Sequence, residues 1–276
     1  MSGASRSPSR PDQSGRARSG AARVQVAAVA RRSIVRTMRQ PAMIVPAVFF
    51  PLLLLAVNAG GLDAATEIPG FPSSSYLTFA LAIPFMQGAL FAAMSTGTNV
   101  ANDIETGFLS RLSLTPLRRV WLLVGQLSGA LVLGVVQAIT FLAVGLLAGA
   151  DLEAGAAGAL VILALSLLIT LGFGSIGAAM ALRTGSGEAV QGLFPLLFVT
   201  LFLSSMALPR DLIEIGWFRA IATWNPVSYL LEGVRSLLIE GWDAHALLAG
   251  FGCAAAIAAL ALAAAASALR TRMART

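Results

Sequence analysis

Six long apolar runs separated by short polar segments dominate the hydrophobic pattern of this chain. A helix needs about 20 apolar residues to cross the hydrocarbon core of a bilayer. No run has a charged residue or a histidine away from its ends. The pattern predicts an all-α membrane protein with a six-span domain over residues 41–276. The predicted transmembrane helices cover about residues 42–62, 76–98, 120–149, 155–182, 189–208 and 245–269.

Two different segments precede the first run. Residues 1–22 are rich in Ser, Gly, Pro and Arg, and we expect a disordered cytoplasmic tail because they offer little apolar surface to bury. Residues 23–40 place Arg32, Arg36 and Arg39 on one helical face and apolar side chains on the other. This pattern predicts an amphipathic helix on the membrane surface, with its arginines towards lipid phosphates.

The arginines predict the orientation of the spans. With a cytoplasmic N-terminus, every arginine except Arg210, Arg219 and Arg235 lies on the cytoplasmic side. The loops at 63–75 and 150–154, on the other side, carry only acidic charges. The positive-inside rule then places both termini in the cytoplasm of a multi-pass plasma (inner) membrane protein. Arginines that flank apolar runs indicate membrane lipids as partners and argue against nucleic acid.

The outside segment 209–244 is too long for a simple turn. It predicts one helix over Asp211–Thr223 and a second that begins after Asn225, an N-cap residue. Two tryptophans suit the membrane interface. The segment is either a cap that seals the bundle or a gate over an exit path. The predicted gate residues are Trp224, Asn225, Pro226 and Tyr229.

The polar segment 99–119 lies between two apolar runs on the cytoplasmic side. It carries Asp103 and Glu105, three arginines and an amphipathic helix pattern. We interpret it as a surface that receives mechanical work from another protein.

Catalytic and cofactor motifs are missing from the sequence. A standard Walker site needs a lysine, and the chain has none. The single His245 and Cys253 do not make a metal site. A GxGxxG run at Gly172–Gly177 lies inside an apolar run, where small-residue helix packing explains it better than a dinucleotide site. The chain is therefore predicted to be no enzyme and to hold no cofactor or metal itself.

The apolar runs also lack the buried carboxylates that ion-coupled carriers commonly use. A transporter without them and without its own ATPase needs an external energy source. An ion-coupled secondary carrier remains one alternative, and a non-transporting membrane scaffold another.

Three motifs on this topology carry a family resemblance. They are Asp103–Leu112 with Thr115-Pro116, Asn225–Tyr229 with Glu232 and Arg235, and Phe202–Ser205. With these motifs at these places on the predicted topology, the sequence resembles the permease subunit of ABC type-2 transporters, in the daunorubicin-resistance-like exporter group.

The resemblance implies the rest of the assembly. A second permease copy would complete the pathway as a homodimer, and a separate ATPase subunit in two copies would hold ATP and Mg²⁺. Hydrophobic small molecules or lipids (drugs, lipids or lipid-linked glycans) would move outwards. A coupling helix would seat in the ATPase through Asp103, Glu105, Thr106, Gly107, Phe108, Leu109 and Arg111.

Other interpretations stay open for these residues. Asp103 and Glu105 either bind basic residues of the ATPase, position the helix end, or are ordinary solvated acids. Phe108 and Leu109 either enter the ATPase or dip into the bilayer surface. Aromatic, methionine and amide side chains are candidates to line an apolar substrate path, with plain helix packing as the alternative. These path candidates are Phe85, Met86, Gln87, Phe91 and Gln137.

Overall fold

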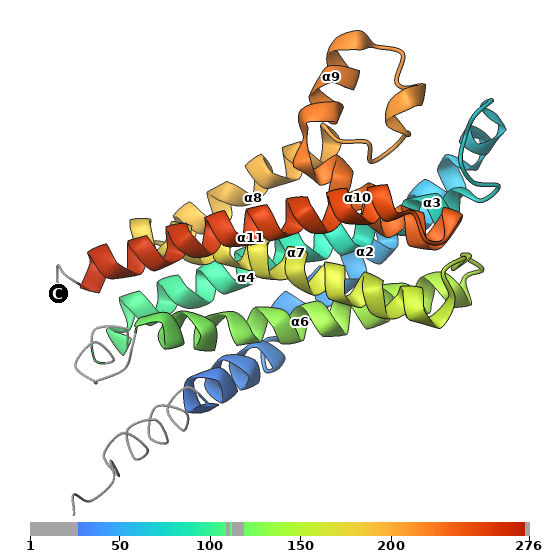
Figure 1. Cartoon of the computed structure of the whole chain (residues 1–276). Coiled ribbons are helices and arrows are strands. Elements are labelled where there is room, and N and C mark those ends of the chain that lie inside the picture. The colour runs from blue at the N-terminus through green and yellow to red at the C-terminus, as the bar shows by residue number, and fades with distance from the viewer. Residues whose placement is uncertain (1–26, 109–110, 112–118, 274–276) are drawn as a thin grey trace, which may run out of the picture.

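The computed structural model describes residues 27–108, residue 111 and residues 119–273, and the following statements refer to these residues. Every regular element among them is helical, so the predicted all-α class is confirmed. The helices gather side by side into an elongated bundle (Figure 1).

Five helices in the described part are long and apolar enough to cross a membrane. They match five of the six predicted runs to within a few residues at most ends. The second has a break at Leu81, because Pro84 lacks the N–H that would bond to the carbonyl of Ala80. The five are α2 (Pro41–Gly61), α3 with α4 (Tyr76–Ala80 and Ala82–Glu105), α6 (Arg119–Leu147), α7 (Gly155–Thr184) and α11 (Ala244–Met273).

The sixth apolar run forms a shorter helix, α8 (Gly187–Phe202), of 16 residues. At about 1.5 Å per residue it is about 24 Å long, less than the hydrocarbon core of about 30 Å. The prediction extended this span to residue 208, but the helix ends at Phe202, with Leu203 as its C-cap, and turns follow. The count of six complete spans therefore stays a prediction.

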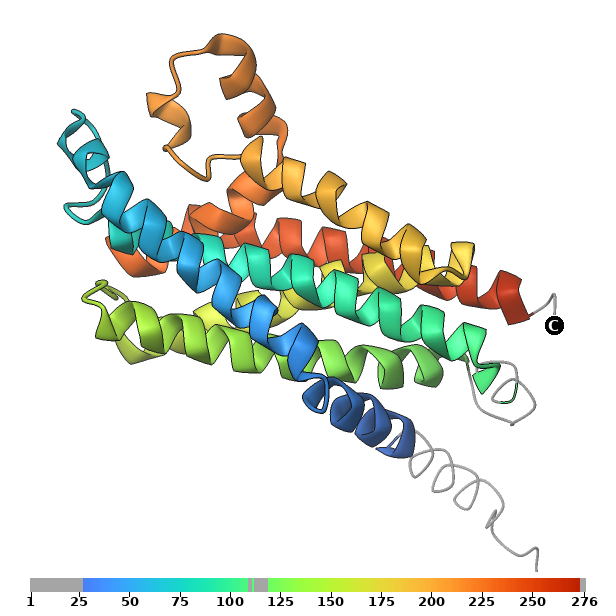
Figure 2. The ribbon, with the colours of Figure 1, turned by 180° about the vertical axis from the view of Figure 1, so that it is seen from behind.

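A separate helix over residues 27–38 precedes α2. It ends before Gln40, whose backbone is non-helical (φ −110°, ψ 69°), because Pro41 disfavours the helical conformation in the residue before it. The predicted amphipathic helix is thus present over its described residues. Its start at 23–26 and the tail at 1–22 lie outside them. From behind, α2 continues from this helix past a bend and crosses the bundle in front of α4 (Figure 2).

The most buried helix, α4, packs against α2, α6, α7 and α8. Glycines on α7 allow the closest approach, since a Cβ at Gly177 would overlap the carbonyl of Ala93. Gly172 faces Ala258 of α11, and Gly174 faces Thr96 of α4. The GxGxxG run therefore serves helix packing, as predicted.

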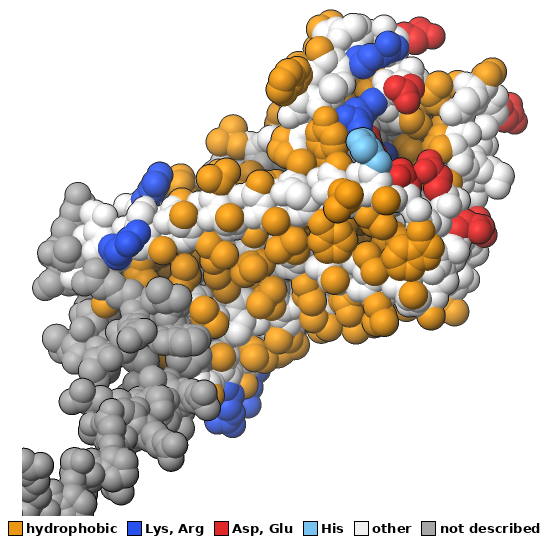
Figure 3. All heavy atoms as spheres, viewed as in Figure 1, with side chains coloured by type: hydrophobic (Ala, Val, Ile, Leu, Met, Phe, Trp, Pro, Cys, Tyr) orange, Lys and Arg blue, Asp and Glu red, His pale blue; other side chains and the backbone are white. Residues whose placement is uncertain are grey.

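The two ends of the bundle differ. Helix 27–38, the end of α4 and the C-terminal end of α11 lie at one end, and η1 (Asp63–Glu67) and α9 (Gly216–Trp224) lie at the other (Figure 1). On the face shown in Figure 3, the visible acidic side chains gather at the α9 end. The orientation of the bundle in the membrane stays a prediction.

The segment 209–244 holds more elements than the two predicted helices. The first predicted helix is divided, because residues 213–215 are not helical and Arg219 Nε donates to the Ile213 carbonyl at 2.6 Å. The second prediction is confirmed, since Asn225 Oδ1 accepts from Val227 N at 3.0 Å and Pro226 is the first helical residue. The elements are η2 (Arg210–Leu212), α9, α10 (Pro226–Arg235) and the π-helical turn η3 (Ser236–Glu240).

Candidate functional site

Asp103 occupies a buried position near the end of α4, with 2% of its surface exposed. Arg32 donates to both carboxylate oxygens, at 2.9 and 3.1 Å, and Arg36 donates at 2.8 Å. Gln126 Nε2 of α6 donates at 2.8 Å. We call these four residues the Asp103 cluster. It joins helix 27–38, α4 and α6 at one carboxylate, and both oxygens of this carboxylate accept hydrogen bonds.

Helix 27–38 reaches this carboxylate because it packs closely on α6. A Cβ at Gly125 would lie 2.5 Å from Val29 Cγ1, and one at Gly129 would lie 2.6 Å from Ser33 Oγ. Ser33 Oγ also donates to the Gln126 carbonyl at 3.0 Å. Small residues four apart let two helix backbones approach in this way.

The prediction that the basic face of this helix points to lipid phosphates is wrong for two of its three arginines. Arg32 and Arg36 bind Asp103, because packing on α6 turns their face towards α4. Arg39 is exposed.

The candidate coupling segment begins where α4 ends. Gly107 has a positive φ of 67°, the left-handed conformation that often follows a helix C-terminus, and glycine adopts it without strain. Phe108 and Arg111 are helical, and the Arg111 N–H bonds to the Gly107 carbonyl at 3.2 Å. The Arg111 guanidinium donates to the Thr106 carbonyl at 3.0 Å. The Phe108 ring lies under the Arg32 guanidinium, 3.7 Å from its centroid.

These contacts separate the predicted coupling residues into two groups. Asp103 is enclosed within the chain, so its buried oxygens do not face a partner protein, and Phe108 packs against Arg32. Glu105, Thr106 and Arg111 are exposed. Leu109 lies outside the described residues, as do Ser110 and residues 112–118.

Sequence reasoning missed the three partners of Asp103. Arg32 and Arg36 stand four residues apart, a spacing that lets two side chains meet one carboxylate. Gln126 is uncharged and lies within an apolar run. Nothing in the sequence links the two arginines to an aspartate 71 and 67 positions away.

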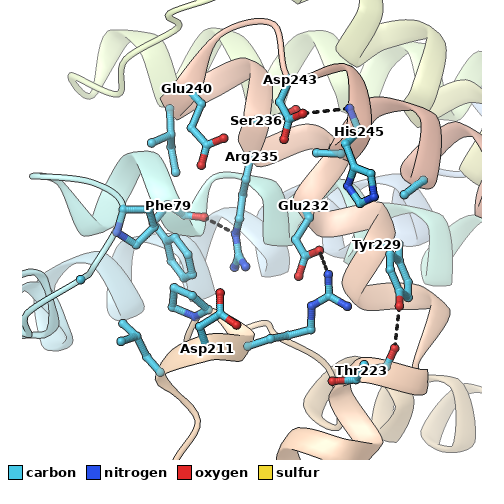
Figure 4. Close-up of a pocket in the computed structure, with 18 of the residues that line it drawn as sticks. Phe79, Asp211, Thr223, Tyr229, Glu232, Arg235, Ser236, Glu240, Asp243 and His245 are labelled. Atoms are coloured by element: carbon cyan, nitrogen blue, oxygen red, sulfur yellow. Dashed lines mark hydrogen bonds and ion pairs between the residues drawn. The ribbon is translucent and has the colours of Figure 1, made fainter.

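A cavity of about 500 Å³ lies at the opposite end of the molecule (Figure 4). Arg210 and Glu232 form an ion pair beside it, and the Arg210 guanidinium lies 4.5 Å from the centroid of the Tyr229 ring. We call this cavity the outer pocket. Its other labelled residues are Phe79, Asp211, Thr223, Arg235, Ser236, Glu240, Asp243 and His245.

Arg235 forms the inner wall of the outer pocket and is 6% exposed. Its three nitrogens donate to the carbonyls of Phe79 at 3.0 Å, Ser205 at 2.6 Å and Met206 at 2.6 Å. Burial lowers its pKa to about 9, against the opposing effect of Glu232, so it stays protonated at neutral pH. From its sequence position, Arg235 is predicted to be an outside arginine within a motif. In the structure it ties α10 to α3 and to the turn after α8.

The predicted gate residues take different positions. Tyr229 borders the outer pocket, and its hydroxyl donates to the Thr223 carbonyl at 2.9 Å. Asn225 caps α10 and also donates to the Thr200 carbonyl of α8 at 2.6 Å. Pro226 is exposed at the start of α10, and Trp224 is 87% exposed.

The predicted path residues lie mainly inside the helix bundle. Phe85, Met86, Gln87 and Gln137 are each at most 4% exposed, and none borders the outer pocket. Gln137 Nε2 donates to the Ala47 carbonyl at 2.9 Å, which ties α6 to α2.

Two amide oxygens in this interior, Oε1 of Gln87 and of Gln137, have no hydrogen-bond partner among the described residues. Phe91 packs edge to face against Phe50 and at a tilt against Phe194, with ring centroids 6.1 and 5.4 Å away. Helix packing explains most of these contacts.

Long apolar helices and an arginine-rich end define a multi-pass membrane protein. The family model for the ABC-2 type transporter matches residues 24–239. The chain belongs to this family. Within the described residues, no group of three or more His, Cys, Asp and Glu side chains could hold a metal ion.

Two relatives carry the printed name "Putative transport permease ycf38". The one from Porphyra purpurea is 26% identical over 213 residues, which cover 76% of this chain and 72% of the relative. The one from Pyropia yezoensis is 24% identical over 215 residues, covering 77% and 73%. The similarity thus extends over most of both chains and agrees with a transport permease.

Proposed function

We propose that this chain is the membrane subunit of an ATP-driven exporter. It moves a hydrophobic or amphipathic substrate, such as a drug, a lipid or a lipid-linked glycan, out of the cytoplasm. Membership of the ABC-2 type family implies a partner ATPase subunit in general. In this proposal two copies of the ATPase hold the ATP and Mg²⁺, and the permease works as a homodimer in the plasma membrane with cytoplasmic termini.

The Asp103 cluster is the observation that carries this proposal. It fixes the end of α4 to helix 27–38 and α6, directly before the exposed residues Glu105, Thr106 and Arg111. A buried carboxylate that accepts four hydrogen bonds from two other helices resists local deformation. Force applied to the exposed turn therefore passes to α4, the most buried helix of the bundle.

The opposite end supplies a candidate exit. The outer pocket lies between α9, α10, η3 and the start of α11, and Arg235 holds α10 against the bundle. In the proposal α9 and α10 form the gate, and Tyr229 is the predicted gate residue that borders the cavity. The assignment to the daunorubicin-resistance-like subgroup stays a prediction.

The deciding experiment is co-purification with a P-loop ATPase, sought first among the reading frames that neighbour this chain's own, followed by ATP hydrolysis and substrate export from reconstituted vesicles. We expect hydrolysis to depend on the ATPase and transport to need both proteins. Glu105→Arg should weaken the complex, because it reverses an exposed charge on the coupling segment. Glu67→Arg makes the same change at an exposed position of η1 at the other end and should have no effect.

The alternative functions give other results. Transport by this chain alone that follows a proton gradient and survives ATP depletion would establish a secondary carrier. A stable complex with no transport of any tested amphiphile would favour a scaffold. The mass of the purified complex tests the homodimer independently.

A further inference from the structure

A second cavity, of about 620 Å³, opens between the end of α7 and the last turns of α11. Two arginines, Arg183 and Arg272, and the hydroxyls of Thr184, Ser267 and Thr271 line it. The remaining lining residues are apolar, and no carboxylate is among them. We call it the inner pocket. Its surface is cationic and suits a ligand with negative charge.

Arg272 is held in place before any ligand arrives. Its Nη1 donates to the Leu182 carbonyl at 2.9 Å, one of the last carbonyls of α7. Gly185 follows this helix with a φ of 75°, and a Cβ there would lie 2.5 Å from Arg272 Nη2. Glycine thus provides both the left-handed turn and the space for the guanidinium.

Both arginines keep donors for a ligand. A guanidinium has five N–H groups, and Arg272 uses one of them in the contact with Leu182. Arg183 is exposed, and neither residue forms an ion pair within the part of the chain that the structure describes. Arginine forks match phosphate oxygens in geometry as well as charge.

The position of the inner pocket selects a membrane lipid as the ligand. Helices α7 and α11 have 30 residues each, so each is about 45 Å long and extends past a hydrocarbon core of about 30 Å into the headgroup layer. Leu260, 73% exposed, lies on the same face of α11 as Ser267 and Thr271, because these positions are seven and eleven residues apart. This apolar surface leads from the pocket towards the middle of the membrane and suits an acyl chain.

We propose that the inner pocket binds the headgroup phosphate of an anionic phospholipid from the cytoplasmic leaflet. Arg183 and Arg272 donate to the phosphate, and the acyl chains lie along the Leu260 face of α11. The lipid fills the space between α7 and α11 at the end of the bundle that also carries the Asp103 cluster. This inference concerns lipid binding and holds whether or not the chain is an exporter.

Native mass spectrometry of the full-length protein with added phosphatidylglycerol or phosphatidylcholine tests the site. The variant Arg183→Gln/Arg272→Gln should retain about one tenth as much phosphatidylglycerol as the wild type, since charge-assisted contacts are lost. Retention of phosphatidylcholine should be low in both proteins and change little, because its quaternary ammonium offsets the charge of its phosphate. Arg270→Gln is the matched control, because Arg270 is exposed on the same helix turn but does not line the pocket. It should behave as the wild type.

Three outcomes would overturn the proposal. An equal loss of phosphatidylglycerol retention in Arg270→Gln would show that the lipid is held by general electrostatic attraction and not at a specific site. Displacement of the lipid by millimolar inorganic phosphate would show a free-anion site. Unchanged lipid retention in a double variant that no longer associates with the ATPase would assign the arginines to a protein contact. If the double variant does not fold, Arg183→Gln alone should still lower retention of phosphatidylglycerol, and no change would refute the site.

Discussion

The guanidinium of Arg36 lies 2.8 Å from the carboxylate of Asp103, although 67 positions separate the two residues in the chain. Arg32 binds the same carboxylate. The pairing fixes helix 27–38 to the end of α4, next to the turn that exposes Glu105. It makes Asp103 a structural link within the chain and leaves Glu105 as the acidic residue of the coupling segment that a partner can reach.

Replacement of Asp103 by Ala should lower the free energy of unfolding by about 2 kcal/mol, because its charge-assisted hydrogen bonds are lost while the partly exposed guanidinium groups regain water. Chemical denaturation in detergent measures this loss. Glu105→Ala, an exposed neighbour on the same helix, should change stability by no more than about 0.5 kcal/mol.

A double-mutant cycle between Asp103→Ala and Arg36→Ala separates the ion pair from other effects of truncation. We expect the double variant to be less destabilised than the sum of the single variants. Strict additivity would show that the two side chains do not interact and would remove the structural basis of the proposed coupling route.

The small residues Gly125 and Gly129 on α6 should determine how closely helix 27–38 packs against it. Gly125→Ala places a methyl group against Val29, and Gly129→Ala places one against Ser33. Each should destabilise the protein by about 2 kcal/mol through overpacking and should speed tryptic cleavage at Arg31. Gly192→Ala, within α8, meets no atom within 4 Å and is the matched control. Cleavage at Arg31 unchanged from that control would contradict the close packing of helix 27–38 on α6.

The helices were predictable from the sequence because long apolar runs leave few other structures possible in a membrane. The N-cap at Asn225 and the packing role of Gly172–Gly177 also follow from local chemistry. The length of α8 does not follow from local chemistry, since apolar residues continue past Phe202 while the backbone turns. Hydrophobicity marks where a chain can enter the membrane but does not fix where a helix ends.

The sites were less predictable, because their contacts join residues far apart in the chain. Asp103 was recognised as special, but its partners lie on two other helices. Arg235 was counted as a charge on the outside, whereas burial between α3, α8 and α10 decides its role. Such pairings depend on helix packing, and a single sequence does not contain that information directly.

Replacement of Arg235 by Lys should lower the stability of the protein, although it keeps the positive charge. The fork of Arg235 reaches three carbonyls on two separate segments, and one ammonium nitrogen of Lys does not span them. Arg235→Lys should therefore cost about 3 kcal/mol, since at least one buried carbonyl loses its donor. Arg270→Lys, at an exposed position, should cost less than about 0.5 kcal/mol. Equal unfolding midpoints for the two variants would refute the anchoring role of Arg235.

Single cysteines test the orientation of the whole bundle. The native Cys253 is replaced by Ala, and Ala64→Cys or Thr106→Cys is added, both at exposed positions at opposite ends of the molecule. The arginine-rich end should face the cytoplasm, because positive charges resist translocation. An impermeant maleimide should therefore label Ala64→Cys in intact cells and should label Thr106→Cys only after the membrane is opened. The reverse pattern would invert the topology and place the Asp103 cluster outside, where no cytoplasmic ATPase could reach its neighbour Glu105.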